Sequence, residues 1–142
     1  MNTTKGSIDS LYLLQKRALK TIMKLPRDTG TVLIFNKVNK LPLINLYDYH
    51  AQLFIYNVLN GLTPEIFKDY FVLIENVHKH DTRAHDGLYV IPCTKKTFKN
   101  SLKAKAKSLW DSIPKIIQAS TSIYTFKKLL KLNYLNSLTP LV

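Results

Sequence analysis

Apolar residues recur at spacings of three and four along most of this 142-residue chain, and this period constrains the fold more than any other feature of the sequence. In residues 8–25 they form one apolar face, made of Leu11, Leu14, Ala18, Ile22 and Leu25. The opposite face is basic, with Lys16, Lys20, Lys24 and Arg27. Such a pattern predicts an amphipathic helix, which Pro26 should end.

Further helices are predicted in five segments: residues 31–39, 46–60, 63–73, 98–111 and 122–135. Asn45 can cap the second of these helices and Gly61 can terminate it. That helix is apolar nearly all round, so we expect it to be buried and His50 to be a hydrogen-bonded core residue. Thr63 and Pro64 indicate the next start, with a capping hydroxyl and a proline at the first helical position.

The helical period fails between residues 74 and 97, where Gly87, Pro92 and clustered polar residues occur. Only residues 88–91 alternate as a strand does, so we expect a long loop with one small hairpin. The predicted fold class is therefore mainly α, with about six helices in a small helical bundle. We expect one domain over residues 1–142; any subdomains would be 1–74 and 98–142, joined by the loop 75–97.

Positive charge is concentrated in the last part of the chain, whose total net charge is +12. Residues 1–86 hold 11 Lys and Arg against 8 Asp and Glu, whereas residues 87–142 hold 10 Lys against Asp111 alone. This asymmetry favours a polyanionic partner, because lysines that neutralise phosphates release condensed counterions. The alternative is a solvated, lysine-rich surface.

Specific lysines follow from helical spacing. In a helix through residue 113, the apolar face would contain Phe98, Leu102, Ala106, Leu109 and Ile113. The adjacent stripe and the next helix give the candidate phosphate contacts, which are Lys96, Lys99, Lys103, Lys107, Lys127, Lys128 and Lys131. Arg83 is a further candidate; it could bind phosphate bidentately or hold its own loop through Asp81 or Asp86.

Trp110 is the only tryptophan and falls between the apolar face and the lysine stripe. We expect it to pack in the core and, through the turn at Pro114, to hold the last two helices together. The alternative role is a platform on which a nucleic-acid base stacks.

Catalytic and metal-binding patterns are not evident. No two acidic residues are adjacent and the four glycines are isolated, which argues against two-metal chemistry and a phosphate-binding loop. His78, His80 and His85, with Asp81, Asp86 and Cys93 nearby, have no spacing known to close a zinc site. A Cys93 nucleophile with His85 as its base lacks a group to orient the imidazole. We therefore expect no enzyme activity, cofactor, metal or small-molecule substrate.

Cellular location is predicted from absences in the sequence. A single cysteine fits a reducing compartment, and neither a secretory signal nor an apolar run long enough to span a membrane is evident. We expect an intracellular protein, nuclear or cytoplasmic, with no membrane partner.

Five segments in order resemble one family: residues 11–25, 43–64, 76–84, 108–114 and 120–135. They contain "LQKR", "LINLYDYHAQLFIYNVLNGLTP", "HDTRA", "SLWDSIP" and "FKKLLK". Together they resemble the C-terminal region of reverse transcriptases of non-LTR, LINE-type retrotransposons, in particular the jockey-like group. The family more often has Leu-Trp-Asn-Ser-Leu-Pro, so Asp111 and Ile113 are mild departures.

The resemblance implies a polymerase appendage without an active site. The family's endonuclease, the palm with paired aspartates and, in some members, a Cys/His knuckle have no counterpart in this sequence. The implied function is non-catalytic binding of RNA template or target DNA. Two alternatives are a structural module that docks on the reverse transcriptase core, and a relic fragment with no selected role.

Overall fold

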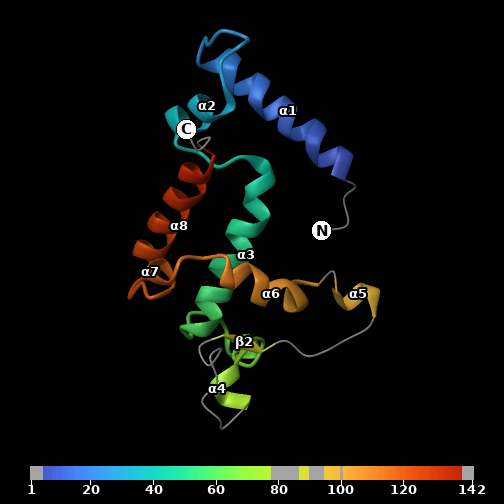
Figure 1. Cartoon of the computed structure of the whole chain (residues 1–142), viewed down its shortest axis with the longest axis vertical. Coiled ribbons are helices and arrows are strands. Elements are labelled where there is room, and N and C mark those ends of the chain that lie inside the picture. Colours follow the sequence, from blue (N-terminus) through green and yellow to red (C-terminus); the bar gives the residue numbers. More distant parts are fainter. Residues whose placement is uncertain (1–4, 78–86, 90–94, 100, 139–142) are drawn as a thin grey trace. The chain divides into compact units, whose positions relative to one another are not determined.

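The computed structural model describes residues 5–77, 87–89, 95–99 and 101–138, and these ranges are mainly helical (Figure 1). The long helices are α1 (Lys5–Ile22), α2 (Thr31–Val38), α3 (Leu43–Leu59), α6 (Leu102–Asp111) and α8 (Ile123–Ser137). The short ones are α4 (Ile74–Val77), α5 (Lys96–Lys99), α7 (Lys115–Gln118) and a 3₁₀ turn, η1 (Glu65–Phe67). The predicted mainly α class is confirmed.

A two-stranded antiparallel hairpin is the only sheet in the described ranges. Its strands are β1 (Val72–Leu73) and β2 (Leu88–Tyr89), with Val72 opposite Tyr89 and Leu73 opposite Leu88. The predicted hairpin is thus confirmed, although its first strand comes from a segment predicted to be helical. That helix ends after η1, because Val72 and Leu73 must be extended to pair with β2. Ile74, predicted to begin a loop, starts α4 instead, and its N–H donates to the carbonyl of Gly87 (2.9 Å).

The first three helices end in the same way, with a residue in the left-handed conformation. These residues are Lys24 (φ 52°), Asn39 (φ 51°) and Gly61 (φ 66°). After α3, the N–H of Leu62 donates to Asn57 O (2.8 Å) and that of Gly61 to Val58 O (3.1 Å), which is a Schellman motif. Gly61 is therefore the predicted terminator. The first helix ends at Ile22, earlier than predicted, because the same motif at Lys24 reverses the chain before Pro26.

Two predicted helix starts are wrong. α3 begins at Leu43, so Asn45 lies within the helix; the Leu43 N–H donates to Gln15 Oε1 (2.9 Å) instead. Pro64 stands before η1 and not at its first position, and no side-chain cap is formed there. The predicted helix 98–111 is also interrupted, because Ser101 caps a new helix by accepting the N–H of Ala104 (3.3 Å).

The chain forms two compact units. One contains the described residues of Met1–Tyr49 and Lys128–Val142, and the other is His50–Lys127, so α3 and α8 each contribute to both. These units do not coincide with the segments 1–74 and 98–142, since the last residues of α8 belong with the first 49. Whether the chain behaves as one domain stays a prediction.

The core of the first unit consists of Phe35, Leu41 and Leu135. Around them pack Tyr12, Leu19, Leu46, Tyr49, Tyr134 and Leu138. The ring of Tyr12 stacks on that of Phe35 with centroids 6.0 Å apart. Residues brought together from α1, α2, α3 and α8 thus share one apolar centre.

The face of α1 that packs on this core is not the predicted one. Tyr12 and Leu19 pack inward, whereas Leu11, Leu14 and Ile22 are 55%, 56% and 76% exposed. Gln15 explains why α1 is rotated relative to the prediction. Its amide donates to Leu41 O (3.5 Å) and accepts a hydrogen bond from the Leu43 N–H. These two bonds turn the face with Tyr12, Gln15 and Leu19 toward the core. Of the predicted apolar face, the four residues that lie on α1 are exposed and Leu25 is half-buried.

The second unit is centred on three aromatic rings. Phe126 stacks on Tyr56 (centroids 4.0 Å apart) and on Trp110 (6.2 Å). The Tyr56 hydroxyl donates to Ser120 O (2.7 Å), and Gln52, also buried, donates to Leu109 O (2.8 Å). Most of α3 in this unit is buried as predicted, but His50 is exposed, so its interpretation as a core histidine is wrong. Its neighbours Ala51, Gln52 and Leu53 occupy the inward face.

Candidate phosphate-binding surfaces

The predicted lysine stripe is divided between two helices. Lys99 is exposed on α5, whereas Lys103 and Lys107 are half-buried one turn apart on α6. The ammonium of Lys103 lies 5.3 Å from the centre of the Tyr70 ring. At this distance the cation is attracted to the negative face of the ring. The prediction of one continuous stripe is therefore wrong, because the chain restarts its helix at Ser101. Lys96 belongs to α5, but its side chain is outside the described part of the structure.

The lysines of α8 are at the surface. Lys127 and Lys128 are exposed and Lys131 is half-buried. Lys127 belongs to the second unit and the other two to the first. Within the part of the chain that is described, none of the predicted lysines of α6 and α8 forms an ion pair.

Trp110 occupies a different environment from the lysines beside it in sequence. Its side chain is 6% exposed, and its carbonyl accepts a hydrogen bond from Gln118 Nε2 (2.7 Å). The Ile113 carbonyl accepts a second one (2.9 Å) from the same amide. Pro114 stands immediately before α7, so this amide ties the α6–α7 turn together. A buried indole of this kind packs in the core and has no open face for a nucleic-acid base.

The remaining predicted residues are seven side chains between residues 78 and 93. Arg83, His78, His80, His85, Asp81, Asp86 and Cys93 lie outside the described residues. Within the described ranges, no three His, Cys, Asp or Glu side chains come together as metal ligands would.

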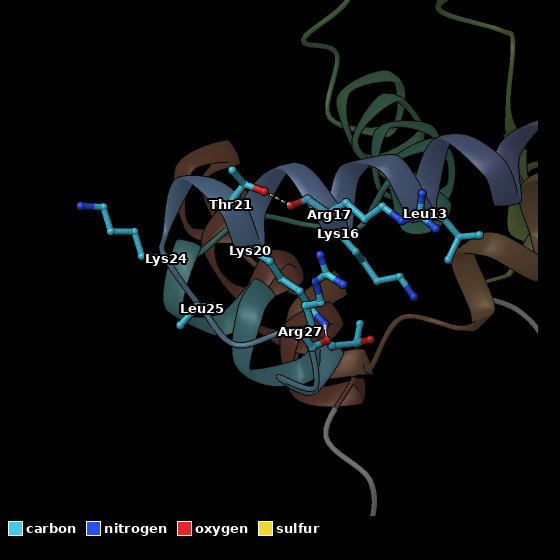
Figure 2. Close-up of a pocket in the computed structure, with 9 residues that line it drawn as sticks. Leu13, Lys16, Arg17, Lys20, Thr21, Lys24, Leu25 and Arg27 are labelled. Carbon is cyan, nitrogen blue, oxygen red and sulfur yellow. Dashed lines mark hydrogen bonds between the residues drawn. The ribbon is translucent and has the colours of Figure 1, made fainter.

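A second basic surface was noted in the sequence only as the polar face of the first helix, and it was not predicted to be a binding site. The end of α1 and the loop after it enclose a hollow of about 810 Å³, which five cationic side chains line (Figure 2). The lining residues are Leu13, Lys16, Arg17, Lys20, Thr21, Lys24, Leu25, Arg27 and Thr31. We name this the basic hollow. The available signal was the recurrence of Lys16, Lys20 and Lys24 every four residues, followed by Arg27.

Comparisons with known proteins do not identify the chain. No protein-family model matches it, and neither a curated protein nor a solved structure matches it. As for the membrane, none of the helices in the described ranges combines the length and the apolar character that crossing it would require.

Proposed function

We propose that this chain is a non-catalytic nucleic-acid-binding module that contacts the phosphate backbone through lysines of α5, α6 and α8. The observation that carries the proposal is the charge imbalance after residue 86, where ten lysines accompany one acidic residue. The surface position of Lys99, Lys127 and Lys128 supports it. Contacts of this kind set affinity and position without reading sequence.

The resemblance to the C-terminal region of non-LTR reverse transcriptases supports the same function. In that setting the module would help to hold RNA template or target DNA beside a polymerase core. The burial of Trp110 favours backbone contact over base stacking as the mode of binding. The isolated acidic residues of this sequence support a role without catalysis.

A triple substitution tests the lysines directly. Lys99→Ala, Lys103→Ala and Lys107→Ala together should weaken binding to single-stranded RNA and flatten its dependence on salt, by about one unit of slope for each phosphate that is no longer neutralised. The matched control is Lys37→Ala, Lys40→Ala and Lys68→Ala, three exposed lysines whose removal changes the net charge equally. Gel-shift titrations over a range of salt measure both. Equal weakening in the two triple variants would contradict a specific role for the stripe.

Absence of catalysis is tested separately. Purified protein given primer–template, magnesium and nucleotides should extend no primer, because paired carboxylates are needed to hold two metal ions. Extension that a single Asp→Asn change abolishes would overturn the proposal.

One observation favours a second candidate function, docking on a reverse transcriptase core. Leu11, Leu14 and Ile22 present an uncovered apolar face on α1. Replacing all three by Gln should leave the fold intact and reduce association with the polymerase region of a jockey-like element supplied as a separate chain. Undiminished association of this variant would count against docking through α1.

A further inference from the structure

The basic hollow concentrates positive charge where the chain reverses direction. Three of its five cationic side chains come from α1, and the other two are the left-handed Lys24 and Arg27 in the loop that follows it. Figure 2 shows Lys16, Lys20 and Arg27 directed into the same space, while the Lys24 side chain extends away from them. The volume, about 810 Å³, is within the range of small-molecule sites.

No carboxylate balances this charge in the part of the chain that is described. None of the five cations forms an ion pair there, and Asp28 does not line the hollow. Cations held close together repel one another, and a bound anion would relieve the repulsion. The hollow is therefore electrostatically suited to an anion.

Two of the five side chains have structural contacts. The ammonium of Lys20 donates to the carbonyl of Arg27 and thereby holds the loop against α1. The ammonium of Lys16 lies 4.6 Å from the centre of the Tyr12 ring, which limits its range of positions. The guanidinium of Arg27 is directed into the hollow and presents several donors in one plane. Lys16 and Arg27 are both directed into the hollow, whereas the ammonium of Lys20 is already hydrogen-bonded to the Arg27 carbonyl.

The backbone around the hollow also suits an anion. Thr31, the first residue of α2, lines it, and the cap residue Gly30 offers no side chain to the free N–H groups of that helix. The end of α1 has negative carbonyls, but Leu25 N–H donates to Lys20 O (2.9 Å) and Lys24 N–H to Thr21 O (3.2 Å). These bonds reduce the negative potential that the helix end would otherwise direct at a ligand.

We propose that the basic hollow binds a phosphate group, with the Arg27 guanidinium as a bidentate donor and Lys16 as a point charge. The phosphate is supplied either by a nucleic-acid backbone or by a small oligophosphate. The site contains none of the lysines of α5, α6 and α8. This proposal can therefore be tested independently of the proposed function.

Two probes tested on the intact chain distinguish the sources: inorganic pyrophosphate, followed by calorimetry, and a short single-stranded RNA, followed by salt titration. Lys16→Gln with Arg27→Gln should weaken binding of the true ligand about tenfold or more, since each hydrogen bond to a charged group contributes substantially. Weaker pyrophosphate binding assigns a small oligophosphate. A flatter salt slope for RNA, without pyrophosphate binding, assigns the backbone.

Three further variants make the result decisive. The double variant Lys37→Gln, Lys40→Gln removes the same amount of charge from exposed positions outside the hollow. The binding of both probes to this variant should be unchanged. Arg27→Lys keeps the positive charge but loses the planar pair of N–H donors. It should therefore bind more tightly than a variant with Gln at this position and less tightly than the unchanged protein. The Lys99, Lys103 and Lys107 triple variant should keep pyrophosphate binding. Thermal melts establish that every variant is folded. The proposal is overturned if the hollow variant and the Lys37/Lys40 control bind both probes alike.

Discussion

At the residue scale, the role of Trp110 is decided by the side chains that pack against it and not by its position in the helical pattern. Helical spacing placed it between an apolar face and a basic stripe, and both a core role and a stacking role were compatible with that position. The structure gives it Phe126 as a ring partner, at 6.2 Å and an interplanar angle of 24°. Phe126 is 16 residues away in sequence, so no local pattern could have identified the contact.

Replacing Trp110 by Ala should lower the free energy of unfolding by about 3–5 kcal/mol, because a large buried ring leaves a cavity. Chemical denaturation measures the change. Tyr124→Ala is the matched control, since Tyr124 is 75% exposed and its removal should cost about 0.5 kcal/mol or less. A Trp110→Ala variant as stable as this control would show that the indole is not a core residue.

Lys24 allows a prediction in the opposite direction. Lys24 has a positive φ, a conformation that is about 1–2 kcal/mol unfavourable for a residue with a Cβ. Glycine lacks the Cβ and avoids this strain, but it loses more backbone entropy on folding, so only part of the energy is gained. Lys24→Gly should therefore raise the free energy of unfolding by about 0.5–1 kcal/mol. Asn39→Gly is the control, because asparagine already tolerates this conformation and little should change. A destabilised Lys24→Gly variant would contradict this account of the α1 terminus.

At the scale of elements, periodicity predicted which segments are helical better than it predicted their faces. Residues of α1 have two apolar sides, one with Leu11, Leu14 and Ile22 and another with Tyr12 and Leu19. Hydrophobicity alone favours the first. The choice of the second depends on two hydrogen bonds of the Gln15 amide, one donated to the Leu41 carbonyl and one accepted from the Leu43 N–H, which join residues 26 and 28 positions apart. Such long-range contacts are not visible in a helical period.

The candidate sites show the same limit. The excess of lysine after residue 86 could be counted from the sequence, but the division of the stripe depends on Ser101. The basic hollow was missed because the first helix was expected to continue to Leu25. The observed reversal at Lys24 brings Arg27 back beside Lys20, whose ammonium then reaches the Arg27 carbonyl.

Ser101 tests the interruption between α5 and α6. Its hydroxyl accepts the Ala104 N–H, so Ser101→Ala should lower the free energy of unfolding by about 1 kcal/mol. Ser108→Ala is the control, because Ser108 is exposed within α6 and alanine favours a helix more. Denaturant titration of both variants gives the comparison. If Ser101→Ala matched Ser108→Ala, the cap would not contribute to stability.

At the scale of the whole molecule, the first unit is assembled from distant parts of the chain. Leu135 contributes to the same core as Phe35 and is buried, whereas Leu132 on the same helix is 44% exposed. Leu135→Ala should lower the free energy of unfolding by about 2–5 kcal/mol, and Leu132→Ala by about 1 kcal/mol or less. Urea denaturation would detect the difference. Equal effects would mean that α8 does not complete this core.

This assembly also affects how the protein is made. Phe35 leaves the ribosome 100 residues before Leu135, an interval of about 5–20 seconds at ordinary rates of translation. Throughout that time α1 and α2 lack the leucine that completes their core, and their apolar side chains face water or a chaperone. The nascent chain therefore exposes this apolar surface to proteases and to aggregation until the last turns of α8 are available.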